Sequence, residues 1–349
     1  MKSKVSISLV LTLALAVVDW SLSNCQGIAA TPTPILAKEA NPIKDEILLS
    51  KLVCPERGRP CYDDARSPSS GISIISPTRG LLLASDNQPM LSWTEVSGAT
   101  SYSVRVEDSG KTLWYEKVEN RTEIPYPEEQ PPLEPDKDYE LIVETIVGDD
   151  IKSGRQRFRL LSQLESQDVQ AEAEAISTNP ELTADEKALK IAELYQEKDL
   201  LTEAIASLNS ALKNQSGSIS IYQMLGDLYR EAGIPTLAES PYQQALNRAT
   251  TLNDTNAQAE AQVGLARVNV TKMNWEQAIS WLEAAHKNYE TLNNQELATQ
   301  VTQFLGEVYE KSGNLDKAIY WYQQARNGYE ELGDTERLEY VEKQLRYLE

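Results

Sequence analysis

The stretch AIYWYQQA at residues 318–325 decides the fold of the C-terminal half of this chain, because its pattern returns at a nearly fixed spacing. The pattern is an alanine, a large side chain four residues later, and a second alanine three residues after that. Earlier copies begin at Ala204, Ala238 and Ala278, so successive copies are 34, 40 and 40 residues apart. Internal repetition at such a period predicts a stack of similar supersecondary units.

A second pattern precedes each copy by twelve residues and consists of an aliphatic residue followed by a small one. The pairs are Ile191-Ala192, Leu225-Gly226, Leu265-Ala266 and Leu305-Gly306. Small residues let two antiparallel helices approach closely, and large residues fill the gaps between neighbouring hairpins. Because one hairpin cannot bury its own apolar face, the copies are expected to stack.

These two patterns resemble the tetratricopeptide repeat, a helical hairpin with a period of about 34 residues. The longer copies resemble the variant with extended helices, since Tyr289 and Tyr329 continue their second helices. The resemblance implies that residues 181–349 form an array of four repeats. A lone amphipathic helix from Glu336 to Leu348 is expected to cap its end.

Local signals agree with this array. Thr183 and Glu186 have the spacing of a capping box that starts a helix. Gly233 and Gly313 fall at the expected hairpin turns, where a left-handed residue is needed. Pro241 falls inside the second helix of copy two, where a proline removes a hydrogen bond and bends the helix. Residues 161–180 are expected to form a connecting helix.

Residues 71–160 differ from the rest, because short runs of strand-forming residues alternate with turn residues. The runs are Ile72–Ile75, Leu81–Ala84, Met90–Trp93, Tyr102–Val106, Leu113–Val118, Arg121–Ile124, Tyr139–Ile146 and Arg155–Leu161. Short strands at this spacing are typical of an all-β sandwich. Successive residues of a strand point to opposite faces, so one member of the adjacent pair Trp114 and Tyr115 is expected to face outward.

The same segment resembles a fibronectin type III domain. The likeness rests on Leu91 and Trp93 in one strand, on the run from Gly98 to Val106, and on the run from Leu133 to Val143. The resemblance implies that Tyr139 makes a corner, with its hydroxyl bonded to backbone and its ring in the core. Trp93 is then a core residue, and sugar stacking is the alternative.

Residues 1–30 are expected to be a signal peptide. Lys2 and Lys4 precede an apolar run from Val5 to Val18, which is shorter than a membrane span. Ile28 and the two alanines after it offer a cleavage site. An uncleaved N-terminal anchor is the alternative. No second apolar run of that length follows, so no further transmembrane span is expected after signal removal.

The cysteines also point to export. The run Leu22–Cys25 resembles a bacterial lipobox, with Asn24 where glycine or alanine is usual, so Cys25 is a candidate for a lipid anchor. Residues 31–70 are expected to be a linker that holds Cys54 and Cys61 in a loop rich in proline and glycine. In an oxidising compartment these two cysteines are expected to form a disulfide. Free thiols and half of a metal site are the alternatives.

Composition and missing motifs exclude several classes of protein. The net charge of -20, most of it after Leu161, disfavours binding to nucleic acid and to anionic membranes. His286 is the one histidine of the chain and falls at a helix-packing position, which leaves no candidate for a Ser-His-Asp or Cys-His arrangement. Glycine-rich phosphate-binding motifs are absent from the sequence. No catalytic residue, cofactor or metal is therefore expected.

The family resemblance also implies where a ligand would bind, because tetratricopeptide arrays use the inner face of each first helix. Matching the copies to that face gives a set of polar residues flanked by Leu189, Val263 and Val270. The polar residues are Glu193, Gln196, Gln223, Asp227, Arg230, Arg267, Gln303, Glu307 and Glu310. Members of the family that capture a C-terminal carboxylate use neutral or basic donors where this chain has acids. A ligand with positive or amide groups is therefore expected.

Taken together, the sequence predicts a multidomain chain in which an all-β fibronectin III-like sandwich precedes an all-α tetratricopeptide (TPR) solenoid. The layout resembles the exported tetratricopeptide proteins of cyanobacteria. We expect a periplasmic or extracellular, non-enzymatic scaffold or adaptor that binds a protein or peptide in an acidic groove. Two alternatives stay open. One is a cell-envelope carbohydrate binder, which requires exposed coplanar aromatic side chains on one face of the sandwich. The other is an accessory subunit of an enzyme carried by another chain.

Overall fold

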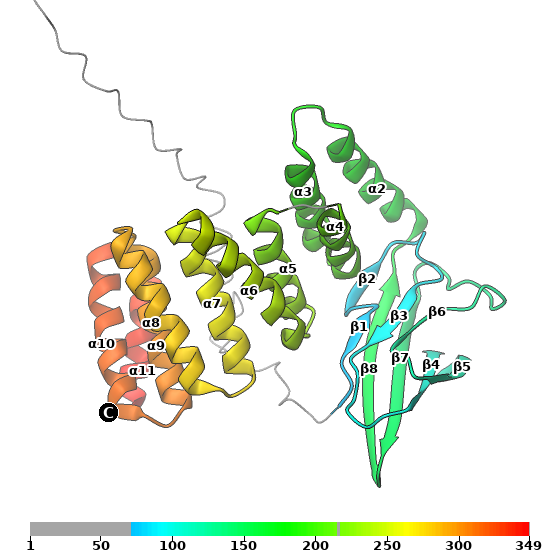
Figure 1. The fold of residues 1–349 in the computed structure, drawn as a ribbon, viewed down its shortest axis with the longest axis horizontal. Helices are drawn as coiled ribbons and strands as arrows, with labels where there is room; N and C mark the ends of the chain where they lie inside the picture. The colour runs from blue at the N-terminus through cyan, green and yellow to red at the C-terminus, as the bar shows by residue number, and fades with distance from the viewer. Residues whose placement is uncertain (1–70, 215–216, 349) are drawn as a thin grey trace, which may run out of the picture. The chain divides into compact units, whose positions relative to one another are not determined.

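The computed structural model describes residues 71–214 and 217–348, and their architecture changes once along the chain (Figure 1). Strands occupy residues 74–160, and helices follow from residue 163 onward. The expected signal peptide, the lipid anchor at Cys25 and the pairing of Cys54 with Cys61 all lie outside the described residues. These three expectations therefore stay predictions.

The β-rich region consists of two sheets. Its strands are β1 (Ile74–Ser76), β2 (Gly80–Leu82), β3 (Met90–Trp93), β4 (Ser101–Asp108), β5 (Lys111–Glu119), β6 (Glu123–Pro125), β7 (Asp138–Val147) and β8 (Asp150–Leu160). The smaller sheet is antiparallel and has the order β1-β3-β6. The larger sheet has the order β2-β8-β7-β4-β5, in which β2 runs parallel to β8 and the other pairs are antiparallel.

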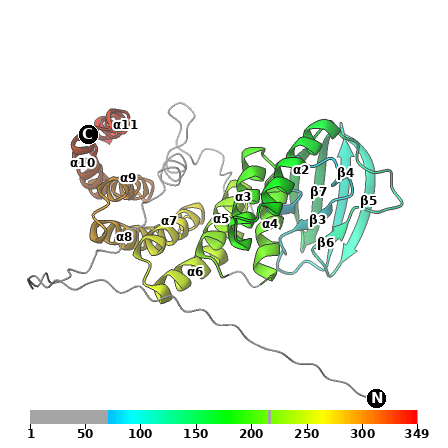
Figure 2. The same ribbon diagram turned by 90° about the horizontal axis from the view of Figure 1, so that it is seen from above.

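Strands β3 and β6 of the smaller sheet lie next to β4 and β7 of the larger sheet (Figure 2). Alternate side chains of the strands point into the space between the two sheets, and there they form one hydrophobic core. Trp93 is 1% exposed and belongs to this core. Trp114 is buried while Tyr115 is 58% exposed, so Tyr115 is the member of the pair that faces outward. The ring of Tyr139 is buried, and its hydroxyl accepts a hydrogen bond from the backbone N–H of Glu134 at 2.8 Å, so the expected corner is present.

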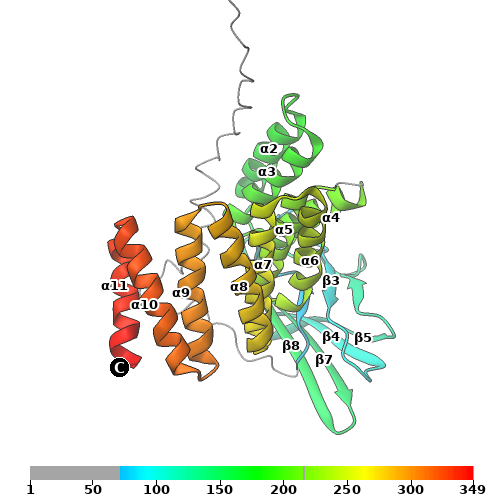
Figure 3. The same ribbon diagram turned by 60° about the vertical axis from the view of Figure 1, so that its left-hand side comes forward.

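The helical part begins with a connecting helix and continues as helical hairpins. The connecting helix α2 (Gln163–Thr178) starts with a capping box made by Ser162 and Glu165. The hairpins are α3 (Ala184–Glu197) with α4 (Leu201–Lys213), α5 (Ile219–Glu231) with α6 (Pro235–Leu252), α7 (Thr255–Thr271) with α8 (Trp275–Thr291), and α9 (Gln295–Lys311) with α10 (Leu315–Leu332). Helix α11 (Thr335–Leu348) follows and packs against α10. Each hairpin contains one of the four sequence copies, and successive helices lie side by side (Figure 3).

Small residues in the first helices are needed because a tyrosine of the second helix occupies the space beside them. The ring of Tyr242 lies so close that a Cβ atom on Gly226 would be 2.7 Å from it. A Cβ atom on Gly264, in the next hairpin, would overlap the same ring. Tyr242 therefore packs against two neighbouring hairpins at once. Tyr322 repeats the contact, at 2.8 Å from a Cβ atom on Gly306.

The helix ends follow the local signals in the sequence. Thr183 and Glu186 form the predicted capping box at the start of α3. Gly233 and Gly313 turn the hairpins of copies two and four with φ angles of 79° and 82°. Asp199 takes the same left-handed conformation in copy one, with φ of 58°, so the turn geometry holds even where glycine is absent.

Pro241 lies inside α6, which is continuous from Pro235 to Leu252. Without a backbone N–H, Pro241 cannot donate the hydrogen bond that the carbonyl of Leu237 would otherwise accept. The second helix of copy two begins at Pro235, so Pro241 lies beyond its first turn. A bend at Pro241 stays a prediction.

Hydrogen bonds join β2 and its flanking residues, near the start of the β-rich region, to the first hairpin, and both belong to one compact unit of the chain. The backbone N–H of Leu81 donates to the carbonyl of Asp199 at 3.0 Å. The N–H of Leu83 donates to the Oε1 atom of Glu203 at 2.7 Å. The N–H of Thr78 donates to the hydroxyl of Thr202 at 3.0 Å. Because β2 and its flanking residues supply these donors, the first hairpin is anchored to the strand next to β8.

Candidate functional site

The first helices of successive hairpins are linked to one another by side chains on one face. Gln196 of α3 donates to Glu231 of α5. Gln223 of α5 donates to Glu260 of α7 at 2.9 Å. Further along, the Arg267 guanidinium of α7 lies 6.0 Å from the ring centroid of Phe304 in α9, and the Tyr340 hydroxyl of α11 lies 3.3 Å from Glu307 in α9. We call the face of α3, α5, α7, α9 and α11 that carries these residues the inner face.

A second set of contacts ties the inner face to the second helix of the same hairpin. The hydroxyl of Tyr242 donates to Asp227 at 2.7 Å. The hydroxyl of Tyr322 donates to Glu310 at 2.7 Å. Tyr329, two turns further along α10, donates to the Oε1 atom of Gln303 at 2.7 Å.

The structure therefore places most of the polar residues predicted for the groove in contacts within the array. Arg230 also belongs to this group, because its guanidinium lies 3.8 Å from Asp227. Among the residues predicted for the groove, Glu193 is exposed and has no hydrogen bond or ion pair in the described part of the chain. Replacing any of the others would therefore alter contacts within the array as well as any ligand contact.

Two carboxyl groups of the inner face belong to residues that are partly shielded from solvent. Burial raises the pKa of Glu260 to about 7, assisted by the negative charges of Asp254 and Asp227, although hydrogen bonds from Asn256 and Gln223 oppose the shift. Burial also raises the pKa of Glu307. Since burial favours the neutral form of each group, a positive partner would be needed to stabilise the ionised form.

Glu231, Glu260 and Gln300 are polar residues of this face that the groove predicted from the sequence does not include. Glu231 and Glu260 accept hydrogen bonds from the preceding first helix. Gln300 lies one helical turn before Gln303 and is 4% exposed. Helical periodicity could have found Glu260 and Gln300, because each lies three residues before a position that the repeat alignment assigned to the groove. Their burial and hydrogen bonding, however, depend on neighbouring helices that are distant in sequence.

The described residues provide no candidate metal site. No group of three or more His, Cys, Asp or Glu side chains in that part of the chain could hold a metal ion. The ring of His286 packs edge-on against Trp321, with the centroids 5.9 Å apart, and its Nδ1 atom lies 3.5 Å from Glu290. His286 thus occupies a packing position, as the sequence indicated.

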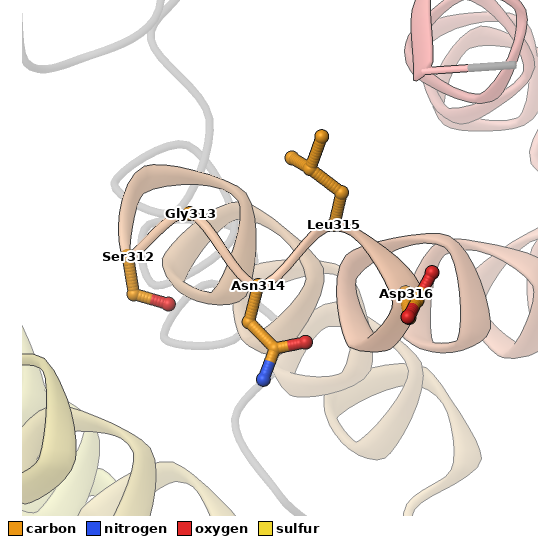
Figure 4. Close-up of a pocket in the computed structure, with 5 residues that line it drawn as sticks. All are labelled: Ser312, Gly313, Asn314, Leu315 and Asp316. Carbon is orange, nitrogen blue, oxygen red and sulfur yellow. The ribbon is translucent and has the colours of Figure 1, made fainter.

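A shallow hollow at the turn between α9 and α10 is lined by residues 312–316 (Figure 4). The side chain of Leu315 points to the opposite side of the turn from that of Asn314 (Figure 4). Among the strands described, Trp93 and Trp114 are buried and Tyr115 is exposed. The coplanar row of aromatic side chains required for carbohydrate binding is not formed by these residues.

Within the described ranges, no helix combines the length and the apolar character that crossing a membrane requires.

Residues 257–331, from α7 to α10, match the family model described as tetratricopeptide repeat. The hairpins of the C-terminal part form a tetratricopeptide-repeat solenoid. The tyrosine and glycine contacts above are thus contacts between and within tetratricopeptide hairpins. Comparison with curated proteins gives no match.

Several solved structures are similar to the helical part of the chain. BtubC (BKLC) from P. vanneervenii is 17% identical, with a TM-score of 0.41 over 53% of this chain and 88% of BtubC. MamA is 20% identical, with a TM-score of 0.39 over 49% of this chain and 92% of MamA. A Rap protein complexed with Competence and Sporulation Factor is 18% identical, with a TM-score of 0.42 over 51% of this chain and 54% of the Rap protein. None of these likenesses identifies a ligand for this chain.

Proposed function

We propose that this protein is an exported, non-enzymatic scaffold that binds a segment of another protein on the inner face of its tetratricopeptide solenoid. The segment would be extended and would present cationic or amide groups. The observation that carries the proposal is the pair of shielded carboxyl groups, Glu260 and Glu307, on neighbouring first helices of a strongly acidic chain. A cationic group that approaches them gains more than it would in water, because the local dielectric is low.

The β-rich region would act as a separate module of this scaffold. We infer that it is a fibronectin III-like sandwich, and two features support the inference. Its strands divide into sheets of order β1-β3-β6 and β2-β8-β7-β4-β5 over a shared core. The hydroxyl of Tyr139 bonds to the backbone of Glu134 five residues earlier, as the tyrosine corner of such sandwiches does.

The test of the binding function begins with selection of peptides from a random 12-residue display library on the full chain. Selected peptides should be rich in Lys, Arg, Asn and Gln and poor in Asp and Glu. Glu260→Gln combined with Glu307→Gln removes both ionisable carboxyl groups and keeps one acceptor oxygen in each side chain, so one of the two hydrogen bonds that Glu260 accepts from Gln223 and Asn256 is lost as well. This variant should weaken binding of a selected cationic peptide about tenfold, which corresponds to about 1.4 kcal/mol.

The matched control replaces two exposed glutamates of the second helices, Glu276→Gln with Glu330→Gln, and should leave the dissociation constant unchanged. Isothermal titration calorimetry measures the dissociation constant of the peptide for the wild type and for both double variants. If no peptide is selected, or if both double variants bind equally to a selected peptide, the inner face is not the binding surface.

A further inference from the structure

Strands β7 and β8 form the longest hairpin among the described strands, and its tip projects beyond the ends of β4 and β5 (Figures 1 and 3). One face of the hairpin points into the core through Tyr139, Leu141 and Val143, so the alternate residues point outward. Near the tip of this outer face, Ile146 is 68% exposed and Ile151 is 71% exposed. The described residues therefore leave this end of the face open to solvent.

The register of the two strands arranges the outward side chains in rows, with one residue from each strand. The outward residues of β7 include three carboxylates, and those of β8 include three arginines. Two columns of opposite charge thus run side by side along the hairpin, and an apolar pair follows them at the tip. The rows are Asp138 with Arg159, Glu140 with Arg157, Ile142 with Arg155, Glu144 with Ser153, and Ile146 with Ile151.

Ion pairs within the chain leave the arginines of β8 accessible. The Nε atom of Arg157 lies 3.3 Å from Glu140, yet the Arg157 side chain is 86% exposed. Arg159 pairs with Asp136 and is also exposed, as is Arg155. An ion pair that is surrounded by water adds little stability. These arginines can therefore bind a second carboxylate without losing a strong contact.

The two columns complement each other in one of the two simple face-to-face arrangements of two copies. If the two-fold axis runs between β7 and β8, parallel to the strands, β8 of each copy lies over β7 of the other. Arg157 then faces Glu140 of the second copy, and Ile146 faces Ile151 of the second copy. If the axis instead crosses the strands, β8 lies over β8 and arginines face arginines. Charge complementarity therefore favours the axis parallel to the strands.

The size of the surface indicates a weak contact. Strand β7 has 10 residues, so the hairpin is about 34 Å long at about 3.4 Å per residue. Two strands are about 10 Å wide, which gives about 340 Å² per copy, less than the about 800 Å² of a standard stable interface. We therefore expect a dissociation constant of about 10–100 μM.

We propose that two copies of this chain associate through the outer faces of their β7–β8 hairpins, about a two-fold axis parallel to the strands. Each copy contributes the same surface, so the contact closes and gives a dimer rather than a filament. The inner face of the solenoid takes no part, so this inference is independent of the proposed binding function. A dimer would offer two solenoids to one partner, and two linked sites bind more tightly than one.

Analytical ultracentrifugation of the full chain between about 1 and about 200 μM measures this association. A monomer–dimer equilibrium is expected, and it should be weaker at about 0.5 M salt because the contact is largely ionic. Arg157→Glu and Glu140→Arg should each weaken dimerisation about tenfold or more, since each places like charges opposite each other. The control Arg121→Glu removes an exposed ion pair with Glu116 outside this hairpin and should leave the dissociation constant unchanged.

Mixing the two charge variants tests the two-fold arrangement itself. In a mixed dimer of Arg157→Glu with Glu140→Arg, the two new side chains face each other with opposite charges, and so do the two original ones. An equimolar mixture should therefore dimerise about as strongly as the wild type, although each variant alone does not. Interactions within each chain are the same alone and in the mixture, so a loss of folding cannot produce this result.

The apolar end of the surface has its own variant. Ile146→Thr combined with Ile151→Thr keeps β-branched residues and should weaken dimerisation about 3- to 10-fold, whereas Met90→Thr on the smaller sheet should not. A chain that stays monomeric at about 200 μM would overturn the proposal. A dimer that Arg157→Glu does not weaken, or a mixture that associates no better than its two components, would overturn it as well.

Discussion

Replacing Glu203 by glutamine should make the stability of this protein less dependent on pH. Glu203 lies on α4, where its Oε1 atom accepts the N–H of Leu83, and its Oε2 atom is buried with no hydrogen-bond partner in the described part of the chain. Burial raises the pKa of this carboxyl to about 7 from an ordinary value of 4.5, and the charge of Asp86 adds to the rise. The ionised form is therefore disfavoured in the folded protein.

The sign of the effect follows from the two pKa values of Glu203. Below pH 4.5 the carboxyl is protonated in both states, and its contribution to stability is fully present. As the pH rises towards 7, the unfolded chain loses the proton while the folded chain keeps it, so the free energy of unfolding falls. The interval between the two pKa values corresponds to at most about 3 kcal/mol. Partial exposure of the side chain reduces the expected loss to about 1–2 kcal/mol.

Urea titrations at pH 5 and pH 8, followed by tryptophan fluorescence, measure this loss. Between the two pH values, the wild type should lose about 1–2 kcal/mol more stability than Glu203→Gln. The unpaired amide nitrogen of the glutamine costs the same at both pH values, so the comparison isolates ionisation. The exposed control Glu276→Gln should follow the wild type. Equal losses in wild type and Glu203→Gln would refute the reasoning.

Three further substitutions test the packing and the local contacts, each by thermal or urea unfolding. Gly264→Ala should destabilise the solenoid by about 1–3 kcal/mol, because the new methyl group would meet the buried ring of Tyr242. An unchanged midpoint of unfolding would mean that the ring can move aside. Tyr139→Phe should cost about 1 kcal/mol by removing the bond to backbone, whereas Tyr115→Phe on the outer face should cost nothing measurable. Thr183→Ala should cost about 1 kcal/mol by opening the capping box, and equal stability would show that the cap is dispensable.

Much of the fold could be predicted from the sequence, because the determining signals are periodic or local. Alanines and glycines recur where helices meet, and large residues recur between them, so the hairpins follow from the repeats. Alternation and turn residues likewise indicated the strands of residues 71–160. Capping boxes and left-handed turns depend on residues three or four positions apart, and Thr183 with Glu186 was found for that reason.

The candidate site was predicted only in part. The repeat alignment gave the face of each first helix but could not show which side chains on it are already engaged. Gln303 is held by Tyr329, 26 residues later, and Gln223 is held by Glu260, 37 residues later. A side chain's availability to a ligand depends on such partners, and no local pattern encodes them. Gln300 shows the converse, because its lack of a partner is also invisible in the sequence.

By itself, the sequence determined the order of the modules, the period of the solenoid and the acidic character of the chain, because each depends on composition or on spacing along the chain. Only the tertiary structure decided how Glu203, Glu260 and Gln300 are shielded. Shielding arises when helices and strands that are distant in sequence exclude water from the same atom. The free-energy cost of burying a polar atom depends on all of its neighbours, and the tertiary fold brings those neighbours together.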